Sequence, residues 1–319
     1  MRSEIVTQWI SQTRWRTWNR TAMTGDASAR RYERLNTSDG TSSVILMDAA
    51  PDLCGSQFPF VKIAEHLRTL SLAAPHILEW DEKLGLMVLE DLGRTDFAKH
   101  LRTHPTDEVT LYEKAAETLL AIQSASPPDG LVSMTPDVGT DMIDMAFEWA
   151  ATDQSGDLWA DVKSNLKALL TQIDPDPRTL SLRDFHAENL IWRPEQNGLN
   201  QIGLLDFQDA FVTHPMYDLA SLLRDARRDV DPNLLDHLLP RFLGGTKDAA
   251  TMKEAFHVIA TQRNLRILGI FHRLSKQDGK DIYLSLIPRV LHHLKTDLAT
   301  PICAPVAPLI SRAFKGLDI

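Results

Sequence analysis

The stretch from Ser181 to Trp192, S-L-R-D-F-H-A-E-N-L-I-W, constrains this chain more than any other segment. It sets Asp184 and Asn189 five residues apart, and a second acid, Asp206, follows in G-L-L-D-F-Q-D. Phosphoryl transfer needs a carboxylate to position the acceptor hydroxyl and take its proton, and oxygen ligands to hold Mg²⁺ on the nucleotide phosphates. These three side chains suit a magnesium phosphoryl-transfer centre, and they occur in the order in which such centres use them.

The turn between the two acidic motifs predicts a β-hairpin. Asn197-Gly198 lies between two apolar runs, N-L-I-W-R and Q-I-G-L-L-D-F, and an Asn-Gly pair in that setting is a strong hairpin signal. Antiparallel pairing would bring Asn189, at the start of one strand, near Asp206, at the end of the other. Carboxylate and amide oxygens brought together in this way are plausible ligands for Mg²⁺.

Length and composition limit the number of domains and the classes of partner that this chain can have. With 319 residues the chain exceeds one minimal core and suits two lobes or domains. A formal net charge of −9 offers no basic field for nucleic acid, and Cys54 and Cys303 form neither a metal-binding spacing nor a disulfide framework. No secretory signal and no membrane-spanning apolar run is visible. We expect a cytoplasmic protein that acts on a small molecule, without nucleic-acid or membrane partners; the sequence leaves its oligomeric state open.

The first part of the chain predicts a small antiparallel sheet followed by a helix. The strand candidates are W-R-T-W-N-R-T, R-R-Y-E-R-L and S-S-V-I-L-M, and F-P-F-V-K-I-A-E-H-L-R-T-L has the apolar spacing of an amphipathic helix. The turn from Gly25 to Ser28 would form a hairpin tip, where backbone N–H groups and the Ser28 hydroxyl are candidates to cap phosphates. The alternative is an ordinary polar turn, which a single glycine favours. The first residues predict a short amphipathic helix with Ile5, Trp9 and Ile10 on one side.

A hinge is expected at the end of the sheet. Two more strand candidates, H-I-L-E-W and G-L-M-V-L, lead into the polar segment E-D-L-G. The exposed backbone of such a segment can hydrogen-bond an adenine edge, which makes Glu90 and Leu92 candidate nucleotide contacts. We place the boundary at Glu90 to Gly93, with residues 1–91 as a nucleotide-binding lobe and residues 92–319 as a catalytic and substrate-binding lobe.

Beyond Gly93 the pattern becomes mainly helical. A helix over D-M-I-D-M-A-F-E-W-A would carry Asp141, Asp144 and Glu148 on one face, either as a solvated surface or at the border of a substrate cleft. Two later helices carry six arginines: Arg224, Arg227, Arg228, Arg263, Arg266 and Arg273. Ion pairing with acids such as Asp225 and Asp229 is the expected role for most of them.

The motifs R-D-F-H-A-E-N, L-L-D-F-Q-D-A and H-P-M-Y-D-L-A-S-L-L together resemble the aminoglycoside phosphotransferase and choline kinase superfamily. The resemblance covers nearly the whole chain. The fuller pattern, with Y-D-L-x-S-L-L-R-D-A-R-R-D-V, is similar to the bacterial N-acetylmuramate/N-acetylglucosamine anomeric kinases of cell-wall recycling. It implies an α+β, protein-kinase-like two-lobed fold, with a small antiparallel sheet lobe and a larger, mainly helical lobe. The implied reaction is ATP-dependent and uses Mg²⁺ to phosphorylate a sugar at C1.

The resemblance also implies residue roles. Asp184 matches the catalytic base, and Asn189 and Asp206 match the magnesium ligands. Asp218 matches the residue that supports the catalytic loop, and it also suits a helix N-cap before L-A-S-L-L. His186 is expected to brace the loop rather than to contact a phosphate.

For a substrate that carries a lactoyl carboxylate, Arg263 or Arg266 is a candidate partner, because guanidinium binds carboxylate with a two-pronged geometry. An anomeric hydroxyl is more acidic than an ordinary alcohol, so a single aspartate base would be adequate for its transfer reaction. Direct, in-line transfer of the γ-phosphoryl group of ATP to that hydroxyl is therefore the expected mechanism.

Two positions depart from the superfamily pattern. Leu182 stands where most members have a histidine, and Met47 stands near the expected strand lysine. The helix residue Glu65, which would pair with that lysine, is therefore expected on the surface unless Arg30 or Arg31 reaches it, and Arg30 is a candidate cation on the nucleotide side. The alternatives are an aminoglycoside or amino-alcohol (choline-like) phosphotransferase and, in another class, a nucleotide-binding regulatory pseudokinase.

Overall fold

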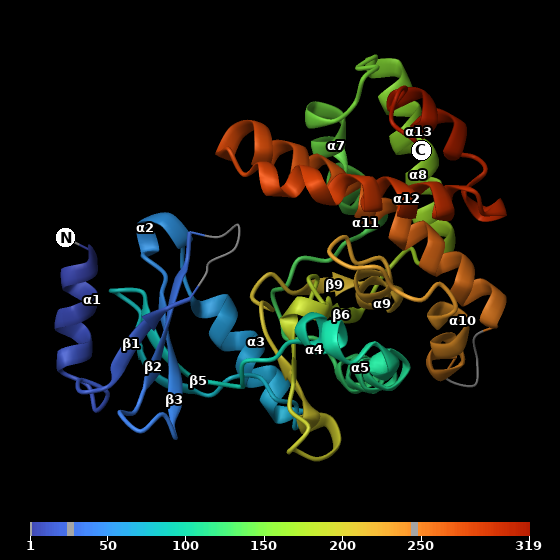
Figure 1. Ribbon diagram of the computed structural model, residues 1–319. Helices are drawn as coiled ribbons and strands as arrows, with labels where there is room; N and C mark the ends of the chain where they lie inside the picture. Colours follow the sequence, from blue (N-terminus) through green and yellow to red (C-terminus); the bar gives the residue numbers. More distant parts are fainter. Residues whose placement is uncertain (1, 24–28, 244–247) are drawn as a thin grey trace. The chain divides into compact units, whose positions relative to one another are not determined.

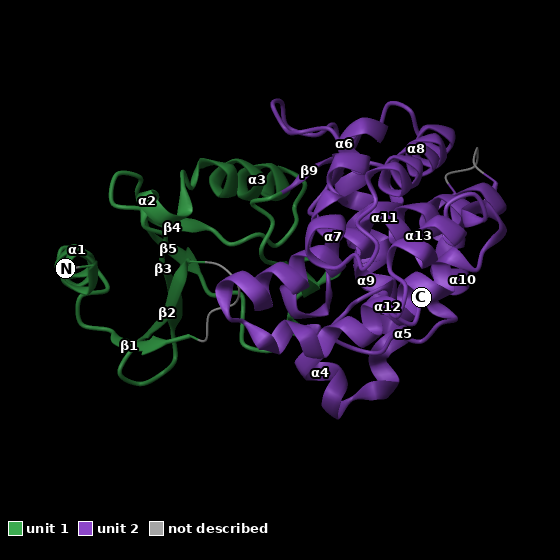
Figure 2. Ribbon diagram, turned by 90° about the horizontal axis from the view of Figure 1, so that it is seen from above, with its two compact units in different colours: residues 1–95, 191–209 green, residues 96–190, 210–319 purple. Residues whose placement is uncertain are grey.

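The computed structural model describes residues 2–23, 29–243 and 248–319. The chain divides into two compact units: unit 1 comprises residues 1–95 and 191–209, and unit 2 comprises residues 96–190 and 210–319 (Figure 2). An antiparallel sheet in unit 1 and the many helices of unit 2 confirm the expected α+β fold class. The functional division into lobes of residues 1–91 and 92–319 stays a prediction.

Unit 1 is built on a five-stranded antiparallel sheet in the order β1-β2-β3-β5-β4 (Figure 1). Its strands are β1 (Asn19–Ala22), β2 (Arg31–Asn36), β3 (Ser43–Asp48), β4 (Ile77–Asp81) and β5 (Leu86–Glu90). Its helices are α1 (Arg2–Ser11), α2 (Pro51–Cys54) and α3 (Phe58–Thr69). The helix α1 lies on one side of the sheet and α3 on the other (Figure 1).

The apolar side chains of α1 pack on one face of this sheet. Val6 and Ile10 form a core cluster with alternate residues of the strands, such as Leu35 on β2 and Leu46 on β3. Of the three residues expected on one side of this helix, Ile10 is buried, Trp9 packs against the cluster and Ile5 is 38% exposed, while Val6 is buried. A helix turn of 3.6 residues puts neighbouring positions on different faces, so the register of a short helix is easily misjudged.

The expected hairpin after the catalytic stretch is present. The strand β7 (Leu190–Trp192) pairs with β8 (Ile202–Leu204). The connection is longer than a two-residue turn: it contains a 3₁₀ turn from Gly198 to Gln201, and the Arg193 N–H donates to the Gln201 carbonyl at 2.9 Å. Gly198 has a φ of 57°, a left-handed conformation that glycine adopts without strain.

Unit 2 contains the remaining helices and the short antiparallel pair β6 (Thr179–Ser181) and β9 (Phe211–Thr213). The helices are α4 (Phe97–Thr103), α5 (Glu108–Gln123), α6 (Pro136–Asp141), α7 (Asp144–Trp149), α8 (Gly156–Ile173), α9 (Met216–Leu223), α10 (Leu234–Leu238), α11 (Ala249–Asp278), α12 (Ile287–Leu298) and α13 (Ala307–Ala313). The long helix α11 packs against α7, α9 and α12 and forms the centre of the unit (Figure 1).

The contact between α11 and α7 depends on one glycine. A Cβ added at Gly269 would lie 2.3 Å from the backbone carbon of Met145, so no larger residue fits there. The single helix expected over residues 141–150 was wrong in extent, because α6 ends at Asp141 and α7 begins at Asp144. Asp141 and Asp144 both accept hydrogen bonds from Lys163 on α8, which places them in a surface ion-pair network.

Candidate active site

The candidate catalytic loop, residues 182–189, is compact and lies in unit 2 between β6 and β7. Local backbone hydrogen bonds shape it: the Asp184 N–H donates to Leu182 at 2.9 Å, the His186 N–H to Asp184 at 3.1 Å, and the Asn189 N–H to His186 at 2.9 Å. Arg183 adopts a φ of 73°, which is uncommon for a residue with a side chain and is typical of loops that present functional groups. The carboxylate of Asp184 is partly exposed and accepts no hydrogen bond from any residue in the described part of the chain.

The side chain of Asn189 closes this loop. Its Nδ2 atom donates to the Asp184 carbonyl at 2.9 Å and lies 3.2 Å from Nε2 of His186. The amide nitrogen is thus engaged inside the loop, so the carbonyl oxygen, which is the atom that Mg²⁺ prefers, is left for an external ligand. His186 is buried, and burial lowers its pKa well below the ordinary value, so the ring is neutral and fits a bracing role.

Asp218 fixes the start of the loop through hydrogen bonds. Its carboxylate accepts hydrogen bonds from Ser181 Oγ at 2.7 Å, the Leu182 N–H at 2.7 Å and the Arg183 N–H at 3.0 Å. The idea that Asp218 caps a helix was wrong, because α9 begins at Met216 and Asp218 lies within its first turn. Leu182, the departure from the superfamily pattern, is buried and still takes part through its backbone N–H.

Asp206 lies in unit 1, two residues after β8. Its side chain is exposed, Gln208 Nε2 donates to its Oδ1 atom at 2.8 Å, and its backbone has a φ of 59°. The next residue, Phe207, is fully buried and its ring stacks on Phe60 of α3 with centroids 4.9 Å apart. This packing fixes the segment that carries Asp206, and a rigid carboxylate suits a metal ligand.

The chemistry of this donor set fits Mg²⁺, which uses few protein oxygens and completes its shell with phosphates and water. Asn189 and Asp206 each present an oxygen of the right kind, although they belong to different units. No group of three or more His, Cys, Asp or Glu side chains in residues 2–23, 29–243 and 248–319 is arranged to hold a metal ion.

The hinge segment of unit 1 is held by a carboxylate that the sequence did not single out. Asp91 accepts hydrogen bonds from Arg34 Nε at 2.6 Å, Arg34 Nη2 at 3.2 Å and Ser43 Oγ at 2.6 Å. The Gly93 N–H also donates to Asp91 at 3.1 Å, and Arg34 donates to the Gly93 carbonyl at 3.1 Å. Burial raises the pKa of Asp91, but these hydrogen bonds outweigh it and the pKa is lowered. The acid in E-D-L-G was the only sequence signal for this contact.

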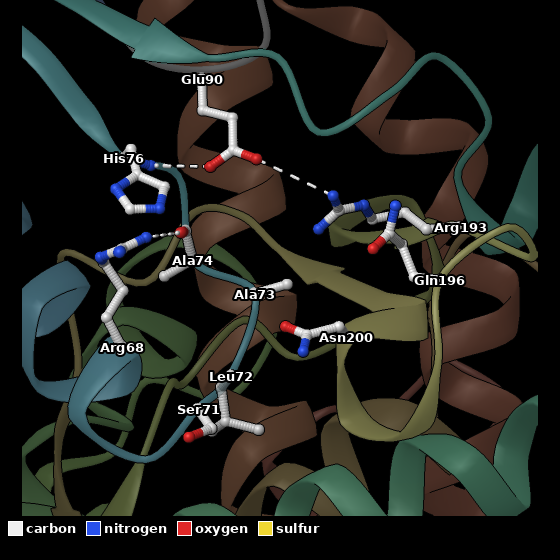
Figure 3. A pocket seen from close by; sticks show the side chains of 10 residues that line it. All are labelled: Arg68, Ser71, Leu72, Ala73, Ala74, His76, Glu90, Arg193, Gln196 and Asn200. Atoms are coloured by element: carbon white, nitrogen blue, oxygen red, sulfur yellow. Dashed lines mark hydrogen bonds and ion pairs between the residues drawn. The ribbon is translucent and has the colours of Figure 1, made fainter.

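The two hinge residues predicted to contact adenine, Glu90 and Leu92, differ in which hydrogen-bonding groups are not already used. The backbone N–H of Leu92 has no hydrogen-bond partner among the described residues, so it is available as a donor. The Glu90 N–H is already used by the His76 carbonyl at 2.8 Å. The Glu90 side chain points into a polar pocket of about 310 Å³, where it meets the His76 N–H at 3.2 Å and Arg193 at 3.8 Å (Figure 3). With its N–H and its side chain engaged, Glu90 offers a nucleotide only its backbone carbonyl.

The position of the missing lysine is apolar. Met47 is fully buried on β3 and pairs in register with Tyr32 on β2. Burial raises the pKa of Tyr32 to about 12, and Arg30 hydrogen-bonds to Tyr32. Because Tyr32 is the cross-strand neighbour of Met47, this arginine lies near the position of the expected lysine. Glu65 is exposed on α3, as expected for a surface residue. Ser28, the predicted phosphate cap, lies outside the described residues.

Three of the six later arginines form ion pairs with acids, and these three follow the end of α9 at Leu223 rather than lying on a helix. Arg224 binds Asp297, Arg227 binds Glu188, and Arg228 binds Glu108. The two candidates for a substrate carboxylate differ: Arg263 is 3% exposed and donates to Ser221 Oγ at 2.8 Å, whereas Arg266 is partly exposed. Arg266 forms no ion pair with any residue that the structure describes.

None of the described helices is both long enough and apolar enough to cross a membrane.

Comparisons with known proteins show the family to which this chain belongs. A model of the phosphotransferase enzyme family matches residues 20–254. The N-acetylmuramate/N-acetylglucosamine kinase of Caulobacter vibrioides is 34% identical over 341 residues, covering 92% of this chain and 91% of that protein. The kinase of the same name from Neisseria meningitidis serogroup B is 33% identical over 301 residues, covering 88% of this chain and 86% of that protein.

The fold agrees as well. A choline/ethanolamine kinase family protein from Mesorhizobium loti matches with a TM-score of 0.68 at 14% identity, covering 98% of this chain and 99% of that chain. At this identity the likeness concerns the fold alone, and it confirms the expected kinase-like fold. With a family model that spans most of its length and a relative at 34% identity, the chain belongs to the phosphotransferase enzyme family.

Proposed function

We propose that this phosphotransferase transfers the γ-phosphoryl group of ATP to the anomeric hydroxyl of an amino sugar, N-acetylmuramate or N-acetylglucosamine, in cell-wall recycling. The observation that carries the proposal is the 34% identity, over nearly the full length of both chains, to a kinase that is named for these two sugars. The proposal places the enzyme in the cytoplasm, where ATP is available.

In this proposal Asp184 orients the acceptor hydroxyl and takes its proton. Its carboxylate is partly exposed and is not engaged by any described side chain or backbone N–H, which supports a role as base. Asn189 and Asp206 would hold Mg²⁺, and bound Mg²⁺ supplies charge neutralisation on the transferred phosphoryl group. Most of the catalytic effect then comes from positioning, which the hydrogen bonds inside the loop support.

On the nucleotide side, the Leu92 N–H and the Glu90 carbonyl would meet the adenine edge. Arg30 hydrogen-bonds to Tyr32, the cross-strand neighbour of Met47. It is our candidate for the cation that binds the phosphates in place of a strand lysine. Ser28 remains a proposed phosphate cap. Replacing Arg30 with Ala should raise the KM for ATP about tenfold, because a charge-assisted hydrogen bond contributes roughly 1.5–3 kcal/mol.

For an acidic acceptor, Arg266 is the better of the two candidate arginines, because it is partly exposed and has no acidic partner among the described residues. Arg263 is enclosed, so its guanidinium is poorly placed for a substrate carboxylate. The Arg266→Ala variant should raise the KM for N-acetylmuramate and leave that for N-acetylglucosamine unchanged. An equal effect on the acidic and the neutral sugar would remove Arg266 from this role.

The direct test is a phosphate-transfer screen of the purified enzyme with ATP and Mg²⁺. The acceptors are N-acetylmuramate, N-acetylglucosamine, an aminoglycoside and choline, and NMR locates the phosphate on each product. We expect turnover with the two acetylated amino sugars and phosphate at C1. Transfer only to the aminoglycoside or to choline would replace the proposal with the corresponding alternative, and ATP binding without any transfer would favour a pseudokinase.

A further inference from the structure

Three buried polar residues lie on α9 or just after it. Asp218 and Ser221 are one turn apart on the same face of α9, and Asp225 follows two residues after the helix ends at Leu223. All three are at most 1% exposed. Asp218 is already engaged by residues 181–183 of the loop, which indicates that this face is turned toward it.

Asp225 meets the loop at a second point. Its Oδ1 atom accepts a hydrogen bond from the Arg227 N–H at 2.8 Å, and the side chain of Arg227 forms an ion pair with Glu188 of the loop at 3.1 Å. The backbone of Ala187 also favours the charged form of the Asp225 carboxylate. Ala187 is fully buried and lies between Asp184 and Asn189. Asp218 therefore fixes the loop before the candidate base, and Asp225 fixes it after the base.

Arg263 supplies the positive charge between these two acids. Its Nη2 atom donates to Ser221 Oγ at 2.8 Å, and its charge acts favourably on Asp218 and Asp225. Arg263 in turn is stabilised by the charges of Asp184 and Asp225. Without such a cation, each of the two buried carboxylates would lose an interaction that offsets part of the cost of its desolvation.

Several polar atoms in this region have no protein partner. They include Nε and Nη1 of Arg263 and Oδ2 of Asp225. Unpaired polar groups are unfavourable inside a protein, and buried water commonly bridges them. A water molecule that accepts a hydrogen bond from Arg263 and donates one to Asp225 Oδ2 would satisfy these atoms.

We propose that Asp225 and Arg263 are positioning residues that form a second anchor for the catalytic loop, acting on the Ala187–Asn189 segment as Asp218 acts on Ser181–Arg183. The proposal rests on the role assigned above to Asp184 and Asn189. Neither residue of the anchor touches substrate; both act through the backbone of the loop.

The test combines kinetics with hydrogen exchange. Asp225→Asn keeps the size of the side chain and removes its charge, so we expect kcat to fall about 10²-fold, as for a small misplacement of catalytic groups, with the KM for ATP and for the sugar changed less than about threefold. Amide exchange should accelerate over residues 185–189 and stay unchanged over residues 181–183. Arg263→Met should reproduce both effects, and Arg263→Lys, which keeps the charge, should recover part of kcat.

A matched control separates this role from general stability. Asp297 is equally buried and binds Arg224 and His257 rather than any residue of the loop, so Asp297→Asn should lower Tm by a similar amount and leave kcat unchanged. If Asp225→Asn does not fold, Ser221→Ala releases only the hydrogen bond to Arg263 and should give a smaller effect of the same pattern.

Unchanged kcat, or unchanged exchange over residues 185–189, in a folded Asp225→Asn or Ser221→Ala variant would overturn the second anchor. Exchange is measured without substrate, so it tests the anchor even if the acceptor proves not to be a sugar. If the unmodified enzyme does not phosphorylate the sugars, that result counts against the proposed function and not against the second anchor.

Discussion

Two buried carboxylates hold the two backbone segments that we assign to catalysis, and they do so by different means. In unit 1, Asp91 binds the guanidinium of Arg34 directly, and its pKa is lowered even though burial raises it. In unit 2, Asp218 accepts hydrogen bonds from a hydroxyl and two backbone N–H groups, the charge of Arg263 acts on it without a direct hydrogen bond, and burial raises its pKa to about 6. A direct ion pair therefore outweighs the desolvation of the partly buried Asp91, whereas neutral donors and an indirect cation do not outweigh the deeper burial of Asp218.

The difference matters because each carboxylate fixes a backbone that has a different task. The hinge at residues 90–93 would present backbone groups to the nucleotide, and its anchor keeps its charge over the whole ordinary pH range. The catalytic loop has an anchor whose charge changes near pH 6. Loss of the first anchor should act on nucleotide binding, and loss of the second should act on the chemical step.

The largest effect is expected from Asp218→Asn. The amide places an NH₂ group among donors, so at least one loop N–H loses its acceptor and the segment before Asp184 shifts. We expect kcat to fall about 10²-fold with nucleotide affinity retained, because small displacements of catalytic groups have effects of this size. Steady-state kinetics and ATP titration calorimetry check it. An intact kcat would show that the loop does not depend on this anchor.

Asp91→Asn should give the opposite pattern. It removes the charge that binds Arg34 and Ser43, so the hinge backbone loosens and the KM for ATP should rise about tenfold, since hydrogen bonds to charged groups contribute about 1.5–3 kcal/mol. The value of kcat at saturating ATP should change less than twofold. A fall in kcat without a change in KM would break the proposed division between the two anchors.

Acidification should lower kcat about tenfold without lowering the stability of the fold. The pKa of Asp218 is about 6 in the folded protein and 3.8 as the ordinary value, so the folded state binds the proton more tightly. Stability from this group therefore rises as the pH falls from about 6 toward 4, while protonation removes an acceptor from the loop. We expect kcat to fall about tenfold between pH 7 and pH 5 without a loss of Tm. The Asp218→Asn variant should lack this inflection, and its persistence there would assign it to another group.

The smallest effect should come from an ion pair in unit 1 that touches no proposed site residue. Arg20 donates to Glu33 at 2.6 Å between β1 and β2, and both side chains are partly exposed. Arg20→Ala should reduce the free energy of unfolding by less than about 1 kcal/mol, because water and ions screen such pairs. Its KM for ATP should match that of the unmodified enzyme, which makes it the control for Asp91→Asn. A raised KM here would mean that any disturbance of the sheet reaches the nucleotide.

Local patterns in the sequence were enough for much of the fold. The strand segments, the helix at residues 58–69 and the hairpin after the catalytic stretch follow from periodicity and turn residues. The order of Asp184, Asn189 and Asp206 was sufficient to identify phosphoryl-transfer chemistry. The break between α6 and α7 was missed, because tertiary packing against α8 and α11 decides it.

The partners of the site residues were harder to predict because they are distant in sequence. Arg34 and Asp91 are 57 residues apart, and Arg263 and Ser221 are 42 apart. Nothing in either segment indicates which acid meets which arginine, since that depends on how the elements pack. Asp225 was expected to form an ion pair, and no local pattern indicated its place beside the loop, because Asp225 lies beyond the end of α9.

The most direct measurement is the turnover of Asp184→Asn with ATP, Mg²⁺ and N-acetylmuramate or N-acetylglucosamine, together with its affinity for ATP. The substitution keeps the shape of the side chain and removes its ability to take a proton. We predict a fall in kcat of at least about 10²-fold, because general-base catalysis contributes roughly 10²–10⁴-fold, with ATP affinity close to that of the unmodified enzyme. Undiminished phosphorylation of the sugar would contradict the account.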